Sequence, residues 1–209
     1  MQLPVETTLI PALRENNIAG DTFIQWLAQE LLSKFFFRKA KDPIIIIGNK
    51  GTGKSLIAES ISKISSKIFE CEEIKKMGYE CHLMNQDMSK ILQNFHTSHQ
   101  SKTPKCIIFE DIQFLTESEQ KELYDYIDFS HTLSKTQGNF CAWILTAENT
   151  QNACQYLVSR FSNQIKLSDL HEREKDLGEI IGFISNMLVK EQNLTPYEVF
   201  SLRAQDDCI

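Results

Sequence analysis

The sequence has no excess of positive charge. Across its 209 residues, 22 lysines and arginines stand against 28 aspartates and glutamates, which gives a net charge of −6. A protein that binds a nucleic-acid backbone needs a positive field over its surface to attract the phosphates. The composition therefore argues against tight nucleic-acid binding, and we expect weak or no direct contact with DNA or RNA.

The sequence also lacks cysteine pairs and long apolar runs. None of its six cysteines belongs to a C-x-x-C pair or to a cysteine and histidine series with zinc spacing. No signal peptide precedes the first charged residues, and no apolar run approaches the length of a membrane span. These absences predict a cytoplasmic protein with reduced thiols and no membrane partner. With 42% hydrophobic residues, the chain has enough apolar material for one core and a small appendage.

One stretch carries a recognisable chemistry. Four isoleucines, Ile44 to Ile47, predict a strand buried on both faces, and the pattern G-x-x-x-x-G-K-S follows directly. This pattern is a P-loop, whose backbone amides and helix N-terminus bind phosphate. Lys54 is expected to neutralise phosphate charge and Ser55 to bind Mg²⁺, whereas the alternative is a glycine turn that merely precedes a helix. The residues predicted to bind ATP or ADP here are Gly48, Asn49, Lys50, Gly51, Thr52, Gly53, Lys54, Ser55 and Leu56.

Strands and helices alternate along the chain. Strand candidates lie at residues 44–47, 81–85, 105–111, 140–146 and 164–167, with amphipathic helical patterns between most of them. This alternation predicts an α/β fold with a five-stranded parallel sheet between helices, and ligands at the carboxyl ends of the strands.

The prediction divides the chain into three parts. Residues 1–15 contain Pro4 and Pro11 and no clear period, so we expect an extended tail there. Residues 16–170 form the nucleotide-binding core, and residues 171–209 a short, incomplete helical lid. The acidic run at residues 70–73 is interpreted as a solvated helix end.

Two carboxylates end the third strand candidate. In a P-loop ATPase of this topology, the first acid holds the Mg²⁺ shell and the second orients the attacking water. Glu110 is therefore predicted to bind the metal with Ser55, and Asp111 to act on the water. Because the longer acid comes first, hydrolysis geometry is expected to be poor while binding persists. The alternative is two solvated acids at a strand end.

Two further polar residues have candidate roles. Thr146, at the end of the fourth strand, is placed to sense the γ-phosphate, or it simply finishes the strand. Arg160 lies just before the fifth strand, where an arginine faces the nucleotide of a neighbouring molecule and acts in trans. A solvated or salt-bridged arginine is the alternative.

Together these motifs resemble the AAA+ class of P-loop ATPases and, within it, the bacterial DnaA initiator family with its shorter Hda-type regulators. The segments that carry the resemblance read IFEDIQFL at 108–115, ILTAE at 144–148 and LVSRF at 157–161. The resemblance implies that Ile18 packs on the adenine and that Arg160 is the arginine finger. It also implies two partners, DnaA and the polymerase sliding clamp, and promotion of the hydrolysis of DnaA-bound ATP. The segment similar to the clamp-binding motif is Gln2, Leu3, Pro4 and Val5.

Other AAA+ proteins offer alternative functions. Residues 170–177 resemble the LRERREDI segment of ATPase motors that activate the alternative sigma factor, although residues 56–105 contain no G-A-F-T-G-A loop. A clamp-loader subunit shares the Ser159-Arg160 pair but usually has a further collar domain. Whether the chain hydrolyses ATP itself, and whether it forms a homo-oligomer, stays open at this point.

Overall fold

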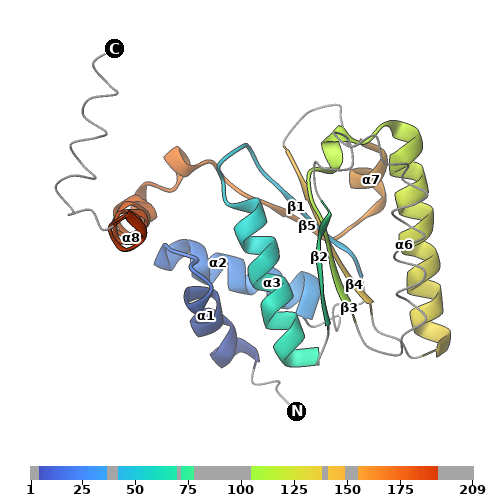
Figure 1. Cartoon of the computed structure of the whole chain (residues 1–209), viewed down its shortest axis with the longest axis horizontal. Helices are drawn as coiled ribbons and strands as arrows, with labels where there is room; N and C mark the ends of the chain where they lie inside the picture. The colour runs from blue at the N-terminus through green and yellow to red at the C-terminus, as the bar shows by residue number, and fades with distance from the viewer. Residues whose placement is uncertain are drawn as a thin grey trace.

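A computed structural model describes residues 5–36, 42–69, 72–77, 105–137, 141–148 and 155–192. Within these ranges five strands form one sheet in the order β2-β3-β4-β1-β5, and every neighbouring pair is parallel (Figure 1). The strands are β1 (Ile44–Ile47), β2 (Glu72–Met77), β3 (Lys105–Phe109), β4 (Cys141–Ala147) and β5 (Gln164–Lys166). The predicted five-stranded parallel sheet is confirmed, with β1 between β4 and β5.

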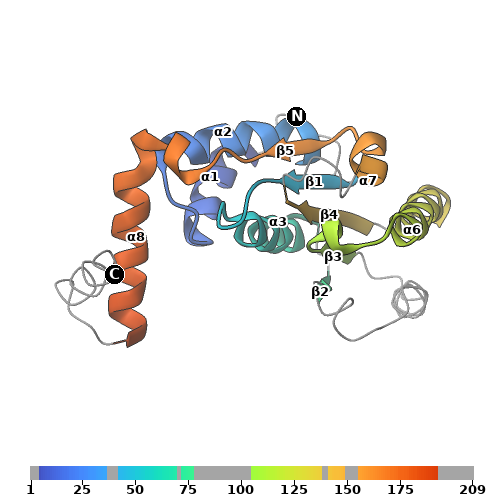
Figure 2. The same cartoon turned by 90° about the horizontal axis from the view of Figure 1, so that it is seen from above.

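Helices cover both faces of this sheet (Figures 1 and 2). One face carries α1 (Val5–Glu15), α2 (Asp21–Leu31), the π-helical turn η1 (Leu32–Phe36) and α3 (Lys54–Phe69). The other carries α6 (Glu117–Gln137) and α7 (Gln155–Arg160), and short 3₁₀ turns lie at η2 (Ile112–Phe114) and η3 (Leu170–Glu172). The helix α8 (Glu174–Gln192) follows η3.

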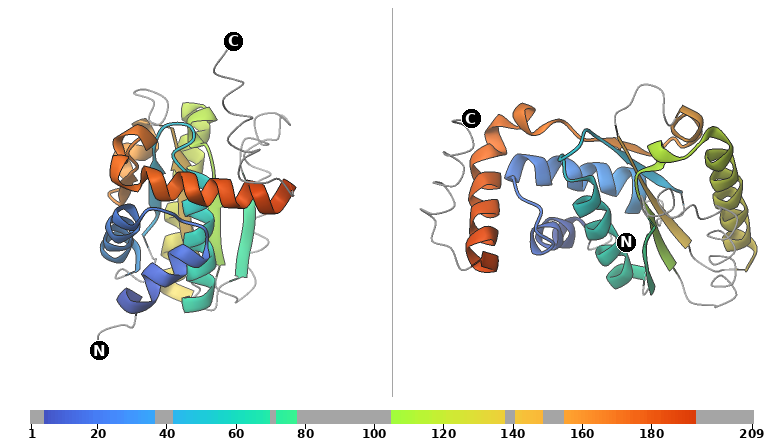
Figure 3. Two further views of the ribbon diagram at one scale, coloured as in Figure 1. Left: turned by 90° about the vertical axis from the view of Figure 1, so that its left-hand side faces the viewer. Right: turned by 45° about the horizontal axis from the view of Figure 1, so that its top comes forward.

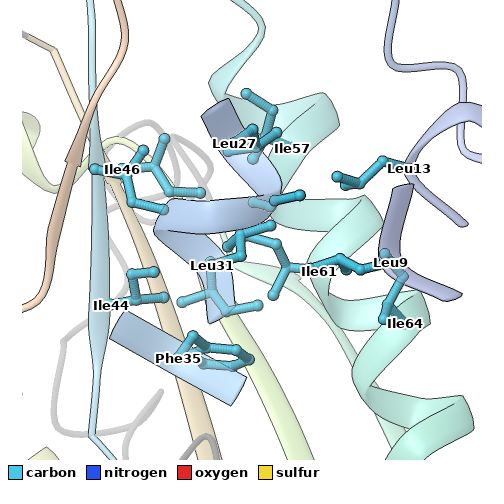
Figure 4. Packing of buried hydrophobic residues seen from close by; sticks show 14 of the residues in the cluster. Leu9, Leu13, Leu27, Leu31, Phe35, Ile44, Ile46, Ile57, Ile61 and Ile64 are labelled. Carbon is cyan, nitrogen blue, oxygen red and sulfur yellow. The ribbon is translucent and has the colours of Figure 1, made fainter. Parts of the chain in front are cut away.

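The strand residues divide between two hydrophobic clusters. Ile44 and Ile46 pack with α1, α2 and α3, whereas Ile45 and Ile47 pack with α6 and α7. Successive side chains of a strand point to opposite faces, so a strand covered on both faces needs an unbroken apolar run. This requirement explains the four isoleucines, and Figure 4 shows one of the two clusters.

The N-terminal segment differs from the prediction. Residues 5–15 form the helix α1 rather than an extended tail, and Leu9 and Leu13 are buried in the core near Ile61 and Ile64 of α3 (Figure 4). Pro11 lies inside this helix, and because proline disfavours a helix interior, the four-residue spacing of Leu9 and Leu13 was not recognised as helical. Gln2, Leu3 and Pro4 of the predicted clamp segment lie outside the described residues, and Val5 is the first residue of α1.

The structure contains a strand that the sequence did not predict. It places β2 at Glu72–Met77, which begins inside the run at 70–73 interpreted as a solvated helix end, whereas the strand candidate at 81–85 is outside the described residues. Among the strands that the structure describes, β2 pairs with β3 alone, so it forms an edge of this sheet. Charged residues are common on edge strands because they discourage pairing with other chains. The charged residues of β2 therefore gave this segment a sequence pattern that does not indicate a strand.

The helix α8 confirms the amphipathic helix predicted after residue 171. It contacts α2 and lies at the opposite side of the molecule from α6 (Figures 2 and 3). Leu177 and Ile184 on this helix are each 37% exposed. Within the described part of the chain, no helix has the length and apolar character that crossing a membrane requires.

Candidate nucleotide-binding site

The P-loop joins β1 to α3 and curls through two left-handed residues. Gly51 and Gly53 have φ angles of 83° and 93°, which glycine adopts without steric cost. Gly48 needs its small size, because a Cβ there would lie 2.6 Å from the hydroxyl oxygen of Thr52. The Gly48 amide donates to the carbonyl of Ala147 at 3.2 Å, which ties the loop to β4.

Lys54 lies inside this curl. Its ammonium group donates to the carbonyls of Gly48 and Asn49, each at 3.0 Å, and the residue is only 8% exposed. The Thr52 hydroxyl donates to the Asn49 carbonyl at 2.8 Å and closes the turn. A buried ammonium requires such acceptors, and it gives the loop a cation at its centre. Lys50, Gly51, Ser55 and Leu56 are exposed around it.

The two acids follow β3 as predicted, and Asp111 is held in an uncommon conformation. Its φ and ψ angles are 56° and 48°, in the left-handed region, and its amide donates to the Thr146 hydroxyl at 3.0 Å. Thr146 is fully buried and pairs in register with Ile46 of β1. The structure therefore brings Asp111 and Thr146 together beside the P-loop strand. Glu110 is partly buried at the end of β3.

Gln113 bridges this cluster, and the sequence analysis missed it. Its side-chain nitrogen donates to the Asp111 carboxylate at 3.1 Å, and its side-chain oxygen accepts the Glu148 amide at 3.0 Å. The bridge links the end of β3 to the end of β4, so it fixes the orientation of the Asp111 carboxylate. Its sequence signal is its place in the IFEDIQFL segment, two residues after the acid.

A second network, also missed, connects the P-loop to the segment that follows β5. The Asn49 amide donates to both carboxylate oxygens of Asp169, at 2.9 and 2.8 Å. The Arg173 guanidinium donates to the carbonyls of Thr52 at 3.3 Å and Ser168 at 2.8 Å. Asn49 and Asp169, like Thr52 and Arg173, are some 120 residues apart in sequence. The P-loop is thus fastened to the segment between β5 and α8.

Arg173 also stacks on α2. Its Cζ atom lies 3.9 Å from the centre of the Phe23 ring, and the residue is 8% exposed. Burial lowers the pKa of Arg173, while the charges of Asp176 and Asp169 act in the opposite direction. The Asp176 carboxylate in turn accepts the amides of Thr22 at 3.0 Å and Phe23 at 3.1 Å at the start of α2.

A pocket of about 500 Å³ opens beside this network. It lies between the start of α2, the end of β5 and the start of α8, and its lining includes Phe23, Trp26, Lys166 and Arg173. Ile18, predicted to pack on the adenine, is buried in the core and is not one of the lining residues. The aromatic and charged lining of the pocket suits a planar, hydrogen-bonding group.

Arg160 lies at the other end of the sheet. It lines a pocket of about 200 Å³ with Asp42 and Pro43, which precede β1, whereas the P-loop follows β1. A four-residue strand is roughly 13 Å long, so Arg160 and Lys54 lie at opposite ends of the strands. The structure therefore does not bring Arg160 together with the other predicted site residues.

The residues present fit a magnesium ion that is bound together with a nucleotide. Among the described residues there is no cluster of three or more histidine, cysteine or acidic side chains that could hold a metal by itself. Magnesium that accompanies a nucleotide needs only one or two protein ligands, because phosphates and waters supply the rest. Ser55 is the second residue of α3 and Glu110 directly follows β3, both at the carboxyl edge of the strands, so their placement is compatible with that role.

The sheet order, the P-loop after β1 and the acids after β3 define an AAA+ P-loop ATPase. Within this class, the chain belongs to the sigma-54 interaction domain family, whose model matches residues 22–170. A comparison with curated proteins found no match.

Three solved structures share the fold. The chain is 22% identical to DnaA from Aquifex aeolicus bound to AMPPCP, with a TM-score of 0.51 over 84% of this chain. It is also 22% identical to a DNA replication initiation factor, with a TM-score of 0.52 over 84% of this chain. The chain is 17% identical to the Thermotoga maritima RuvB Holliday junction branch migration motor, with a TM-score of 0.51 over 81% of this chain. The chain spans 52% of the length of each of these proteins.

Proposed function

We propose that this AAA+ protein binds ATP or ADP with Mg²⁺ and regulates replication initiation by presenting Arg160 to the nucleotide of a partner, DnaA. The observation that carries the proposal is the position of Arg160, exposed and at the opposite end of the strands from its own P-loop. An arginine in that position cannot serve its own nucleotide. If a second molecule docked with its P-loop against this end of the strands, Arg160 would reach the nucleotide of that molecule, as arginine fingers that act in trans do.

The P-loop supplies the nucleotide-binding half of the proposal. Lys54 holds a positive charge at the centre of the curl, where it would bind β- and γ-phosphates. Ser55 and Glu110 would hold Mg²⁺, which neutralises phosphate charge when bound. The 500 Å³ pocket beside Phe23 and Arg173 would take the base and ribose.

The acidic cluster favours binding over turnover. Gln113 and Thr146 hold Asp111 from two sides, so its carboxylate has little freedom to approach an attacking water. The exchanged acid order at Glu110 and Asp111 acts in the same direction. A protein that keeps its own nucleotide and acts on that of another fits this arrangement.

DnaA is the proposed partner because the IFEDIQFL, ILTAE and LVSRF segments resemble its family. The Gln2 to Val5 segment adds the sliding clamp as a second proposed partner, in the cytoplasm and without direct nucleic-acid binding. The chain would then act by contact between proteins rather than on DNA.

The test measures hydrolysis of ATP preloaded on DnaA, with the sliding clamp on DNA and increasing amounts of this protein. We expect stimulation by the wild type and a loss of at least about 100-fold with Arg160→Ala, because a finger contributes at least that much to such reactions. Arg14→Ala, an exposed arginine on the opposite face in α1, is the matched control and should retain full stimulation. Full stimulation by Arg160→Ala would overturn the proposal.

Membership of the sigma-54 interaction domain family favours a second candidate, an ATPase motor acting on that sigma factor. Residues 170–177, which resemble the corresponding motor segment, begin at the end of the matched range. Against this candidate, residues 56–105 contain no G-A-F-T-G-A loop. Turnover by the isolated protein that increases with the sigma factor, and not with DnaA, would favour the motor.

A further inference from the structure

We propose that Tyr156, backed by Tyr124, is a positioning residue that holds the Arg160 guanidinium ready for a partner's nucleotide. The inference rests on the proposed function of Arg160. It adds two residues that neither the sequence motifs nor the family assignment marks for such a role.

The contacts surround the guanidinium on one side. The Cζ atom of Arg160 lies 3.6 Å from the centre of the Tyr156 ring and 5.6 Å from that of Tyr124. Both distances fall within the range of cation–π attraction. One guanidinium nitrogen also donates to the Tyr156 carbonyl at 3.2 Å, one helical turn earlier in α7. Tyr156 therefore holds Arg160 through both its ring and its backbone.

Tyr124 supports Tyr156 from α6. The two rings meet edge to face, with centroids 6.2 Å apart and planes at 86°, and Tyr124 also contacts the buried Phe161 ring at 5.4 Å. Phe161 belongs to the core cluster between the sheet and α6. The stack thus extends from the core to the exposed arginine, so packing against a rigid part of the molecule fixes the position of the guanidinium.

The arrangement has little value for folding alone. Arg160 is exposed, and immobilising a long exposed side chain costs the conformational entropy that it would keep if it stayed free in solvent. In a reaction in trans, the same immobilisation is useful, because the side chain is already ordered when the partner docks. Its remaining guanidinium donors stay available, since arginine has five and the Tyr156 carbonyl accepts from one nitrogen.

The stack predicts which kinetic quantity changes. Docking depends on the whole interface, whereas the rate within the docked complex depends on the position of the guanidinium. Loss of the Tyr156 ring should therefore lower the maximal rate of DnaA-bound ATP hydrolysis by about two- to fivefold, the factor that corresponds to an exposed cation–π contact. The concentration giving half-maximal stimulation should stay the same.

The experiment compares Tyr156→Leu with Tyr156→Phe, which keeps the ring, in the assay with ATP-loaded DnaA, clamp and DNA. Arg160→Ala is measured in parallel. Proton NMR of the isolated protein gives a second measurement, because the ring current of Tyr156 shifts the resonances of the Arg160 protons nearest to Cζ, which lies 3.6 Å from the ring centre. We expect Tyr156→Phe to retain the rate and the shifted Arg160 side-chain resonances, and Tyr156→Leu to lose both.

The two proposals fail in different ways. If Arg160→Ala abolishes stimulation while Tyr156→Leu retains the full maximal rate, the positioning role is overturned and the function of Arg160 stands. A raised half-maximal concentration with an unchanged maximal rate would also overturn it, because Tyr156 would then be a docking residue. If Arg160→Ala stimulates fully, both proposals are overturned.

Discussion

Replacing Gly20 with alanine should loosen the attachment of α8 to the core. Gly20 precedes α2 with a φ angle of 98°, a conformation that residues with a Cβ rarely adopt. A Cβ added there would lie 2.7 Å from the Cβ and 2.9 Å from the Cγ of Asp176. Asp176 is 5% exposed and its carboxylate accepts two amides at the start of α2, so moving it would break both hydrogen bonds. The substitution therefore strains the backbone and displaces the capping carboxylate together.

The two effects can be given magnitudes. The left-handed conformation costs about 1–2 kcal/mol for a residue with a Cβ. Loss of a capping interaction costs a further ~0.5–2 kcal/mol. Together Gly20→Ala should lower the free energy of unfolding by about 2–4 kcal/mol, and each kcal/mol lowers the melting temperature by roughly 2–4 °C in a domain of this size.

Urea-induced unfolding at equilibrium measures this change from the transition midpoint and slope. Gly182→Ala in α8 is the matched control, because a Cβ at Gly182 meets nothing within 4 Å. That substitution should stabilise the protein by up to about 1 kcal/mol, the difference in helix propensity. If Gly20→Ala proves as stable as the wild type, the attachment of α8 to α2 through Asp176 is refuted.

Three further predictions concern the P-loop and its surroundings. Lys54→Ala should weaken ADP binding by roughly 10- to 100-fold, as loss of a charge-assisted phosphate contact does, and calorimetric titration checks this value. Asn49→Ala should lower the free energy of unfolding by about 0.5–1.5 kcal/mol through loss of the Asp169 contact. Urea unfolding measures this free energy, and an unchanged value would contradict the prediction. Thr146→Val should cost about 1–3 kcal/mol because the Asp111 amide loses its acceptor, whereas Thr146→Ser should retain most of the stability.

Local patterns identified most of the elements that surround the site. The isoleucines of β1 and the P-loop glycines required no knowledge of distant residues. The same holds for the capping box at the start of α6, where Thr116 and Glu119 bond reciprocally. Four of the five strands and the helix α3 were therefore predicted close to their observed bounds.

The errors have physical causes. The strand β2 is charged because it lies at an edge, and its strand character comes from pairing with β3. The helix α1 is stabilised by burying Leu9 and Leu13 against α3, which outweighs the helix-breaking tendency of Pro11. In both segments tertiary contacts override the local preference.

Contacts between distant residues explain what was missed at the site. The bond from Asn49 to Asp169 joins residues 120 positions apart, and nothing in the local sequence marks either residue as a partner. Arg173 similarly connects Thr52 to Phe23. By contrast, the location of Arg160 away from the P-loop follows from parallel strand topology, because it precedes a strand that the P-loop strand pairs with.

The measurement that tests the account most directly is ATP turnover by the purified protein, first alone and then with ATP-loaded DnaA and clamp on DNA. The account predicts little turnover by the isolated protein, with ADP or ATP released when it is denatured, and clear hydrolysis in the full mixture that Arg160→Ala abolishes. Rapid turnover by the isolated protein, unchanged by DnaA and by Arg160→Ala, would contradict it.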